Sequence, residues 1–205
     1  MCNSQPGTAA RAAESGSCAC GGQGDAATRR VDAVQELELP AFAFPSPALL
    51  ESVGEARLRQ VVRRHHERLR FGPLAGLFPP EEAAFAELVA RVADYVVESC
   101  GGAADYSSVH GSTCMRTRHF PFSIDESARE VWLEALFQAM VDIDFPNEAR
   151  EEYWNWLEPF SVRMINRRTM KAQPARIPYV LARLRFAPQA PDPSDCGIGI
   201  RFCPH

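Results

Sequence analysis

The chain has 205 residues, of which 46% are hydrophobic, and it carries a formal net charge of -4 with a pI of about 5.8. This acidic balance argues against a general binder of nucleic acid or of anionic membranes, because such proteins need a basic surface. The sequence contains neither a long apolar run nor the apolar core of a signal peptide, so we expect a soluble, cytoplasmic protein without a transmembrane helix.

Composition divides the chain into three parts. Residues 1–40 are rich in Ala, Gly and Ser and poor in large apolar side chains, which predicts a disordered N-terminal extension. Residues 41–170 carry the helical patterns of one folded domain, and residues 171–205 form a Pro-rich C-terminal extension. Within that extension, residues 178–186 could form a helical turn or a strand that packs back on the domain.

Seven cysteines are spread along the chain: Cys2, Cys18, Cys20, Cys100, Cys114, Cys196 and Cys203. Their number is odd and none form a CxxC pair, so neither a zinc site nor a disulfide framework is indicated. Cys18 and Cys20 could bind a soft metal. We expect reduced, solvated thiols instead, because disulfides are rare in cytosolic proteins.

The folded part begins with two helical stripes. Ser46 followed by Pro47 is typical of a helix start. Apolar residues and two histidines then recur at helical spacing: Leu58, Val61, Val62, His65, His66 and Leu69. After a stretch of glycines and prolines, a second stripe consists of Phe85, Leu88, Val89, Val92, Tyr95 and Val96. The glycine pair at 101–102 is a strong signal for the end of that helix.

An irregular segment separates this pair of helices from the next. Residues 103–122 show little helical period, and a long irregular segment inside a helical domain is often functional. His119 lies near its end, just before Pro121, which cannot sit inside a helix. Ser123 and Glu126 have the spacing of a capping box, so we predict a helix that starts directly behind this histidine.

Two further helices complete the pattern. The inward positions of the first are Val131, Trp132, Leu136, Phe137, Met140 and Val141. The second covers residues 151–168, has apolar positions at a period of about 3.6 residues, and should be kinked at Pro159. Because no convincing alternating strand occurs, we predict an all-α domain.

The stretch YSSVHGSTCMRTRHFPFSIDESAREVWL, residues 106–133, resembles the truncated haemoglobins, most closely their second group. That family has a tyrosine, an Arg-His-x-Pro-Phe signature and a helix carrying a tryptophan at the same spacings. Shorter matches occur at the Val-Gly pair of residues 50–58, the turn at 77–82 and the glycine pair of 98–107. The resemblance runs over about residues 49–168. It implies a two-over-two helical sandwich around haem b.

The resemblance also implies roles for individual residues. His119 falls on the proximal histidine, the fifth ligand of the iron, and a neutral imidazole suits that role. Trp132 falls on a tryptophan over the haem, whose indole N–H can donate to a bound ligand. The other implied contacts are Phe78, Val92, Val96, Met115, Arg116, Arg118, Phe122 and Leu136, and the apolar distal positions are Leu88 and Val92. Arg116 and Arg118 are candidates for the haem propionates, although solvated loop arginines would fit the same pattern.

One position departs from the family pattern. Where the family has a distal tyrosine, this chain has His66, preceded by His65. His66 could donate a hydrogen bond to the iron-bound ligand, which we rank first, or coordinate the iron as a sixth ligand. Either histidine could instead be a satisfied core or surface residue, which we favour for His65. Since histidine titrates near neutrality, we expect ligand affinity or coordination to change between about pH 5 and 8.

The resemblance therefore implies a haem globin that binds dioxygen and other diatomic ligands, including NO and CO. NO dioxygenase or peroxidase-like activity is a candidate reaction and would need an unknown external electron donor. We expect a monomer or dimer without nucleic-acid or membrane partners. The alternative is a haem-based gas or redox sensor that signals through its terminal extensions. A haem-free helical interaction module and a cysteine-based metal-binding protein rank below both.

Overall fold

The computed structural model describes residues 37–187, and the regular secondary structure of this part consists of helices without strands. The helices are α2 (Pro47–Val53), α3 (Glu55–Arg70), the 3-10 helix η1 (Ala75–Leu77), α4 (Glu82–Ser99), α5 (Asp105–His110), α6 (Met115–Arg118), α7 (Glu126–Asp142), α8 (Asn147–Val162) and α9 (Tyr179–Phe186). The all-α prediction is therefore confirmed. Over these same residues, no helix combines the length and the apolar character that crossing a membrane requires.

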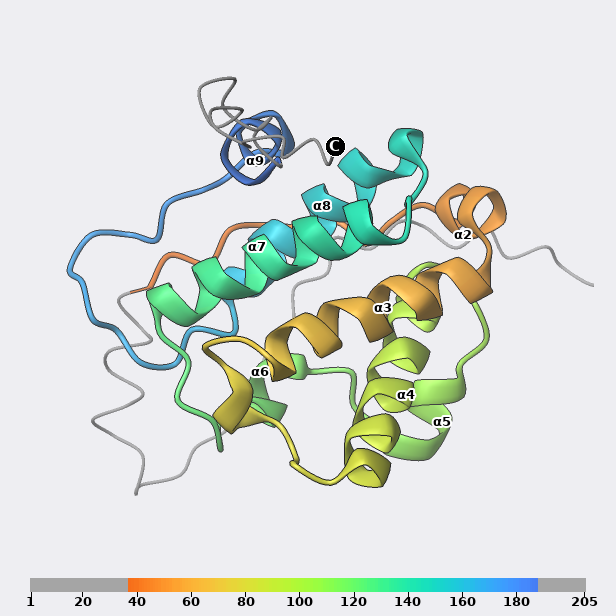
Figure 1. Cartoon of the computed structure of the whole chain (residues 1–205), viewed down its shortest axis with the longest axis horizontal. Coiled ribbons are helices and arrows are strands. Elements are labelled where there is room, and N and C mark those ends of the chain that lie inside the picture. Colours follow the sequence, from red (N-terminus) through yellow and green to blue (C-terminus); the bar gives the residue numbers. More distant parts are fainter. Residues whose placement is uncertain (1–36, 188–205) are drawn as a thin grey trace, which may run out of the picture.

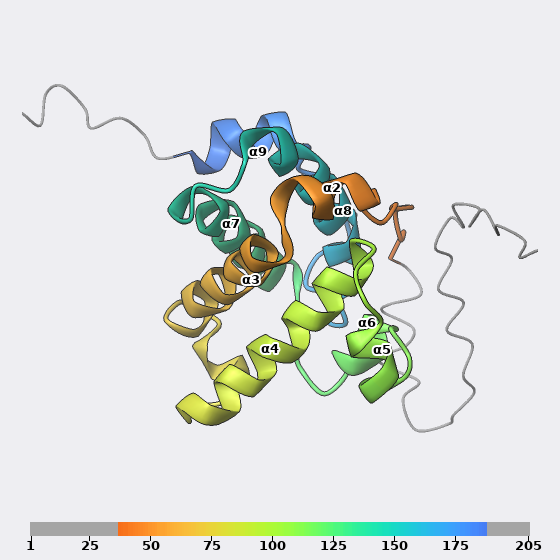
Figure 2. The same ribbon diagram turned by 90° about the vertical axis from the view of Figure 1, so that its right-hand side faces the viewer.

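The four long helices form two packed pairs. α3 packs against α4 on one side and against α7 on the other, and α7 in turn packs against α8 (Figures 1 and 2). The main core lies where these helices meet, and its fully buried side chains include Leu58, Leu136 and Trp154. The short helix α5 packs against α4, and α6 follows it on the way to α7 (Figure 2).

Two glycines that the sequence singled out bend the chain at helix ends. Gly54, with φ of 78°, separates α2 from α3, and Gly101, with φ of 92°, follows the end of α4. L side chains rarely adopt such positive φ values, so glycine stabilises both turns. The sharp change of direction after α2 lets α3 cross the face of α4.

The predicted capping box at the start of α7 is wrong. Asp125, and not Ser123, is the N-cap, and its carboxylate accepts the Ala128 N–H at 2.8 Å. Glu126 is 4% exposed, and its side chain turns to the C-terminal part of the chain, where it accepts hydrogen bonds from Arg168 and Thr169, each at 2.6 Å. Because Glu126 is bound to these partners, tertiary contacts and not local capping determine its orientation.

The predicted irregular segment at 103–122 is also wrong in part, because it contains α5 and α6. These helices have six and four residues, too short for a helical period to be visible in the sequence. The last predicted helix is observed as α8, which begins at Asn147 and ends at Val162. Pro159 lies inside this helix.

Residues beyond the predicted domain pack into its core. α9 shows that the helical alternative for residues 178–186 is correct. Ile177, Ala182 and Phe186 belong to the main core, with exposed fractions of 3%, 0% and 6%. Trp154 of α8 donates its indole N–H to the Ile177 carbonyl at 2.7 Å. The disorder predicted for the N-terminal extension falls almost wholly on residues 1–36, outside the described part, whereas Leu37 is buried.

The cysteines differ from the expectation of reduced, solvated thiols. Cys100 is a free thiol, but it is fully buried, and burial raises its pKa to about 12. Cys114 is disulfide-bonded. The remaining cysteines, Cys2, Cys18, Cys20, Cys196 and Cys203, lie outside the described residues.

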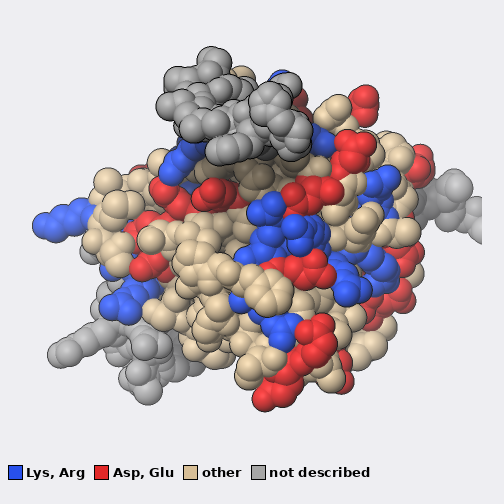
Figure 3. All heavy atoms as spheres, viewed as in Figure 1, with Lys and Arg blue, Asp and Glu red and all other residues tan. Residues whose placement is uncertain are grey.

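Charged side chains of both signs are mixed on the face shown in Figure 3. Many of them form ion pairs between helices, such as Arg68 of α3 with Asp142 at the end of α7, at 2.6 Å. A single-sign surface that would attract a polyanion is not visible on this face.

Candidate functional site

A cavity of about 230 Å³ lies between α3, α4, the turn after α6, α7 and α8. Its wall is mostly apolar and aromatic, as is usual for sites that bind a small molecule or cofactor. The structure places the following predicted site residues around it: His66, Phe78, Leu88, Val92, Val96, Met115, His119, Phe122 and Trp132. They come from four different helices and two turns, so the fold brings together residues that are up to 66 positions apart (66 to 132).

Three predicted site residues do not line this cavity. Leu136 is 1% exposed and belongs to the core. Arg118 donates to the carbonyls of His110 and Ser112, at 2.6 and 3.0 Å, and so stabilises the loop between α5 and α6. Arg116 is half-buried, and burial together with the charge of Arg163 lowers the pKa of its guanidinium. Two neighbouring cations of this kind would be stabilised by an anionic group.

His119 is positioned by the short helix α6, of which it is the C-cap. Its Nδ1 lies 2.7 Å from the Met115 carbonyl oxygen, and because a carbonyl can only accept, Nδ1 carries the proton. Nε2 therefore keeps its lone pair. Burial lowers the pKa of His119 below its ordinary value, so the ring is neutral at pH 7. A neutral imidazole held through one nitrogen, with the other free, is the usual state of a metal-binding histidine.

His66 repeats this arrangement on the opposite helix, α3. Its Nδ1 donates to the Val62 carbonyl at 2.8 Å, which again leaves the Nε2 lone pair free. Burial lowers the pKa of His66, and the nearby His119 lowers it further, against the opposing effect of the Val62 bond. In this neutral tautomer Nε2 can coordinate a metal or accept a hydrogen bond, but it cannot donate one. This geometry fits two of the sequence hypotheses for His66, the sixth ligand and the satisfied core histidine, and does not fit the donor to an iron-bound ligand.

His65 differs from His66 and His119 because it binds another residue of the cavity wall. Its Nε2 donates to the Trp132 carbonyl at 3.1 Å, and the two rings meet edge to face with centroids 4.6 Å apart. Burial lowers the pKa of His65 well below its ordinary value, and the adjacent His66 acts in the same direction. His65 is therefore a neutral, hydrogen-bonded core residue that ties α3 to α7, as the sequence hypothesis favoured. It also holds the backbone of Trp132 in place at the cavity wall.

Sequence reasoning missed two polar residues in the wall, Arg129 of α7 and Ser161 of α8. Arg129 is 3% exposed, although arginine is rarely buried without a partner, and its Nε donates to the Ser161 hydroxyl at 2.9 Å. One signal could have found it: Arg129 precedes Trp132 by three residues, so both project from the same face of the helix.

Comparisons with known proteins identify the family and the fold of the chain. The model of the family described as bacterial-like globin matches residues 48–166. The chain is 30% identical over 117 residues to Group 2 truncated hemoglobin YjbI of Bacillus subtilis (strain 168), a match that covers 57% of this chain and 86% of that protein.

Solved structures give the same result. The phosphate-bound Hell's gate globin IV is 43% identical, with a TM-score of 0.71, over 74% of this chain and 95% of that chain. A truncated oxygen-avid haemoglobin from Bacillus subtilis is 29% identical, with a TM-score of 0.54, over 58% of this chain and 98% of that chain. These matches confirm the truncated-globin fold and the resemblance to its second group.

Proposed function

Because this chain belongs to the bacterial-like globin family, we propose that it binds haem b in the cavity and, through it, dioxygen, NO and CO. The observation that carries the proposal is the pair His66 and His119, two neutral imidazoles that line one apolar cavity, each with a free Nε2. Bound haem iron supplies a site for diatomic ligands and for one-electron chemistry. The absence of a CxxCH motif from the sequence favours non-covalent haem.

His119 would hold the iron from the α6 side, through Nε2. The hydrogen bond from Nδ1 to the Met115 carbonyl orients the ring and makes Nε2 more basic. The backbone behind it is also held, because Asn166 donates to the carbonyls of His119 and Phe122, at 2.9 and 2.8 Å. Such support from a neighbouring element is what a rigid metal ligand requires.

On the opposite side of the cavity, His66 and Trp132 would have different roles in ligand binding. His66 offers a lone pair, so it would coordinate the iron in the resting state and compete with entering gas ligands. Trp132 offers an indole N–H, which can only donate, and it would hold a ligand that has displaced His66. Because burial lowers the pKa of His66 below its ordinary value, we expect any pH dependence of coordination on the acid side of that value.

Arg116 is the better candidate for a haem propionate. Its partly buried guanidinium lies near a second cation, Arg163, whereas Arg118 is exposed and its Nη2 already donates to two loop carbonyls. A carboxylate between Arg116 and Arg163 would offset their mutual repulsion. Arg118 would then act only by keeping the loop before α6 in place.

Absorption spectra of the purified protein test the proposal. We expect an intense haem band that shifts when CO is added to the ferrous protein. His119→Ala should lose haem or bind it in an altered state, and His66→Leu should convert a six-coordinate ferrous spectrum to a five-coordinate one. A folded protein that stays colourless after addition of haemin would contradict haem binding. A His66→Leu spectrum equal to that of the wild type would contradict only the sixth-ligand role.

For the reaction, we propose that the protein consumes NO, with dioxygen as co-substrate and an external reductant as the source of electrons. Its support is the apolar wall, which keeps bulk water from a reactive bound ligand. The measurement is NO consumption by the oxygenated protein with a chemical reductant, compared with the Trp132→Phe variant. Slow consumption by the wild type, equal to that of free haemin, would argue for a binding role alone.

A second candidate function is a haem-based redox sensor that signals through a terminal extension, and Cys114 is the observation that favours it. This disulfide-bonded residue is the N-cap of α6, the helix that ends at His119. Reduction of the disulfide would remove a covalent restraint from the start of α6. The test compares the haem spectrum and CO binding rate of the oxidised protein, the dithiothreitol-treated protein and Cys114→Ser. Identical behaviour of all three would exclude this sensor.

A further inference from the structure

A buried Arg–Glu–Arg network joins α7, α8 and the chain that follows them. Arg129 donates to the Glu158 carboxylate at 2.5 Å, and both side chains are 2% exposed. Arg176 binds the same carboxylate from the other side, at 2.7 and 2.8 Å, and its side chain is 48% exposed. The network therefore consists of two cations that share one anion, and only Arg176 reaches solvent.

The network fastens a segment that lies beyond the family match, which ends at residue 166. Arg129 donates to the Ala175 carbonyl at 2.9 Å, and the Ile177 N–H donates to Glu158 at 3.0 Å. Trp154 adds its bond to the Ile177 carbonyl. Residues 175–177 are thus bonded to α7 and α8 by buried polar groups, and α9 then packs on the same two helices (Figure 1).

At its inner end the same network reaches the cavity. Arg129 and Ser161 both line it, and they are hydrogen-bonded to each other. Arg129 lies one helical turn before Trp132, so a displacement of Arg129 changes the position of that part of α7. Arg176, near the surface, is thus connected to the cavity wall through the side chains of Glu158 and Arg129.

From these contacts we propose that Arg176 is a positioning residue for ligand binding: it holds Glu158, and through Glu158 it sets Arg129 and the inner wall of the pocket next to Trp132. The inference rests on the proposed haem binding. Without Arg176, Glu158 keeps Arg129 as its remaining charged partner, so the carboxylate and the guanidinium both shift. The segment 175–177 is then part of the pocket architecture and not an attached tail.

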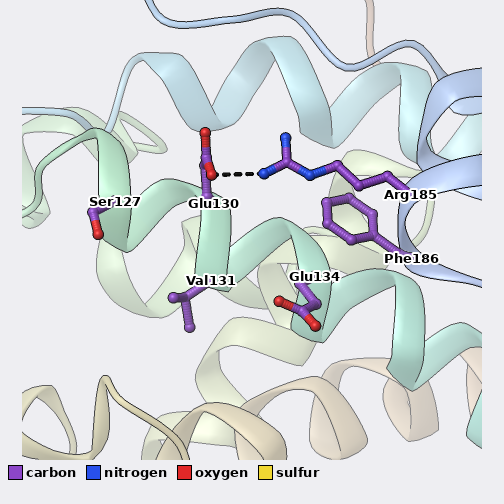
Figure 4. Close-up of a pocket in the computed structure, with 6 residues that line it drawn as sticks. All are labelled: Ser127, Glu130, Val131, Glu134, Arg185 and Phe186. Atoms are coloured by element: carbon purple, nitrogen blue, oxygen red, sulfur yellow. Dashed lines mark hydrogen bonds and ion pairs between the residues drawn. The ribbon is translucent and has the colours of Figure 1, made fainter.

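A matched control lies on the outer side of α7. Figure 4 shows Arg185 of α9 paired with Glu130 of α7, at 2.8 Å, with both side chains about half exposed. This pair also joins the C-terminal segment to α7 through an arginine and a glutamate. The groove in Figure 4 and the haem cavity have no lining residue in common, so Arg185→Gln removes one ion pair without touching the cavity wall.

The experiment measures CO association to the ferrous full-length protein after flash photolysis, and hydrogen–deuterium exchange of the α7 amides. For Arg176→Gln we expect a change in CO association rate of at least threefold and at least fivefold faster exchange around residues 129–133. Arg185→Gln should leave the CO rate at the wild-type value and change the exchange by less than about twofold, because its partner Glu130 lies in this window but the pair is exposed. Rates and exchange equal to those of the wild type in Arg176→Gln would overturn the inference, as would equal changes in both variants.

A second variant covers the case in which Arg176→Gln does not fold. Arg176→Lys keeps the charge but not the forked contact with Glu158. It should show a smaller change of the same sign, and a wild-type CO rate would overturn the inference. If the wild-type protein itself shows no haem band, the proposed function fails and this inference fails with it. If the wild type binds CO and the variants match it, only the role of Arg176 fails.

Discussion

The inner and outer faces of α7 carry chemically similar ion pairs in opposite surroundings. On the inner face Arg129 and Glu158 are 2% exposed, whereas on the outer face Arg185 and Glu130 are 49% and 45% exposed. The two distances, 2.5 and 2.8 Å, differ little. Water screens the outer charges and solvates them when the pair breaks, but it cannot do so for the inner charges. Burial, and not contact distance, should therefore decide what each pair contributes.

The largest effect is expected for Glu158→Gln. The substitution leaves Arg129 as a buried cation without its anion, which costs about 3–5 kcal/mol of unfolding free energy. Urea or guanidinium unfolding, followed by tryptophan fluorescence, measures this loss. A loss below about 1 kcal/mol would mean that Arg129 finds another partner or reaches water, and the contrast between the two faces would disappear.

Acid pH should weaken the inner ion pair. Burial alone would raise the pKa of Glu158, but the bonds from Arg176 and the Ile177 N–H and the charge of Arg129 outweigh it and lower the pKa. Glu158 thus stabilises the fold above the carboxyl value of the unfolded chain, and this contribution is lost as pH falls through the lower folded value. Unfolding free energy should therefore drop below about pH 4.5, and less steeply in Glu158→Gln.

Buried histidine should also lower the unfolding free energy as pH falls, starting at a higher pH than the carboxylates. Burial keeps His65 neutral in the folded protein, while the unfolded chain takes up a proton below about pH 6.5. The resulting loss of unfolding free energy begins below about pH 6.5, at a higher pH than the loss caused by protonation of Glu158. It should persist in Glu158→Gln, so the two contributions can be separated by comparing the pH profiles of the two proteins.

An intermediate case tests whether the effect is graded with burial. Asp125, which is half-buried, accepts one backbone N–H at the start of α7. Asp125→Ala should cost about 1 kcal/mol, the usual effect of removing an N-cap. Ser123→Ala is the control, and because Ser123 does not cap the helix, this variant should stay within about 0.5 kcal/mol of the wild type. A larger loss of unfolding free energy in Ser123→Ala would show that Ser123 caps the helix after all.

The smallest effect is expected on the outer face. Arg185→Gln breaks the exposed pair with Glu130 and should change unfolding free energy by about 0.5 kcal/mol or less. The same denaturation assay measures it, at low and high salt, since salt screens what little the pair contributes. A loss comparable to that of Glu158→Gln would show that the exposed fraction does not predict the energy of these pairs.

Much of this arrangement was predictable from local patterns. The stripe from Leu58 to Leu69 predicts both α3 and the inward direction of His65 and His66, because helical spacing fixes which side chains share a face. The motif around His119 predicts that this residue, Met115 and Phe122 meet at one site, and all three line the cavity. The pattern does not contain the tautomer of His66, which depends on the distance from its Nδ1 to a carbonyl one turn earlier.

The sequence by itself determined the helices long enough to show a period, the glycines at their ends and the family to which the chain belongs. Tertiary structure alone decided what depends on contacts between distant residues. Glu126 turns from a predicted cap to Arg168, and Arg129 becomes part of a cavity wall held by Glu158 and Arg176. A buried charge is stable only when it is paired, because its desolvation is otherwise too costly. Here the paired residues are far apart in the sequence: Arg176 follows Glu158 by 18 residues and Arg129 by 47 (176 minus 158, and 176 minus 129).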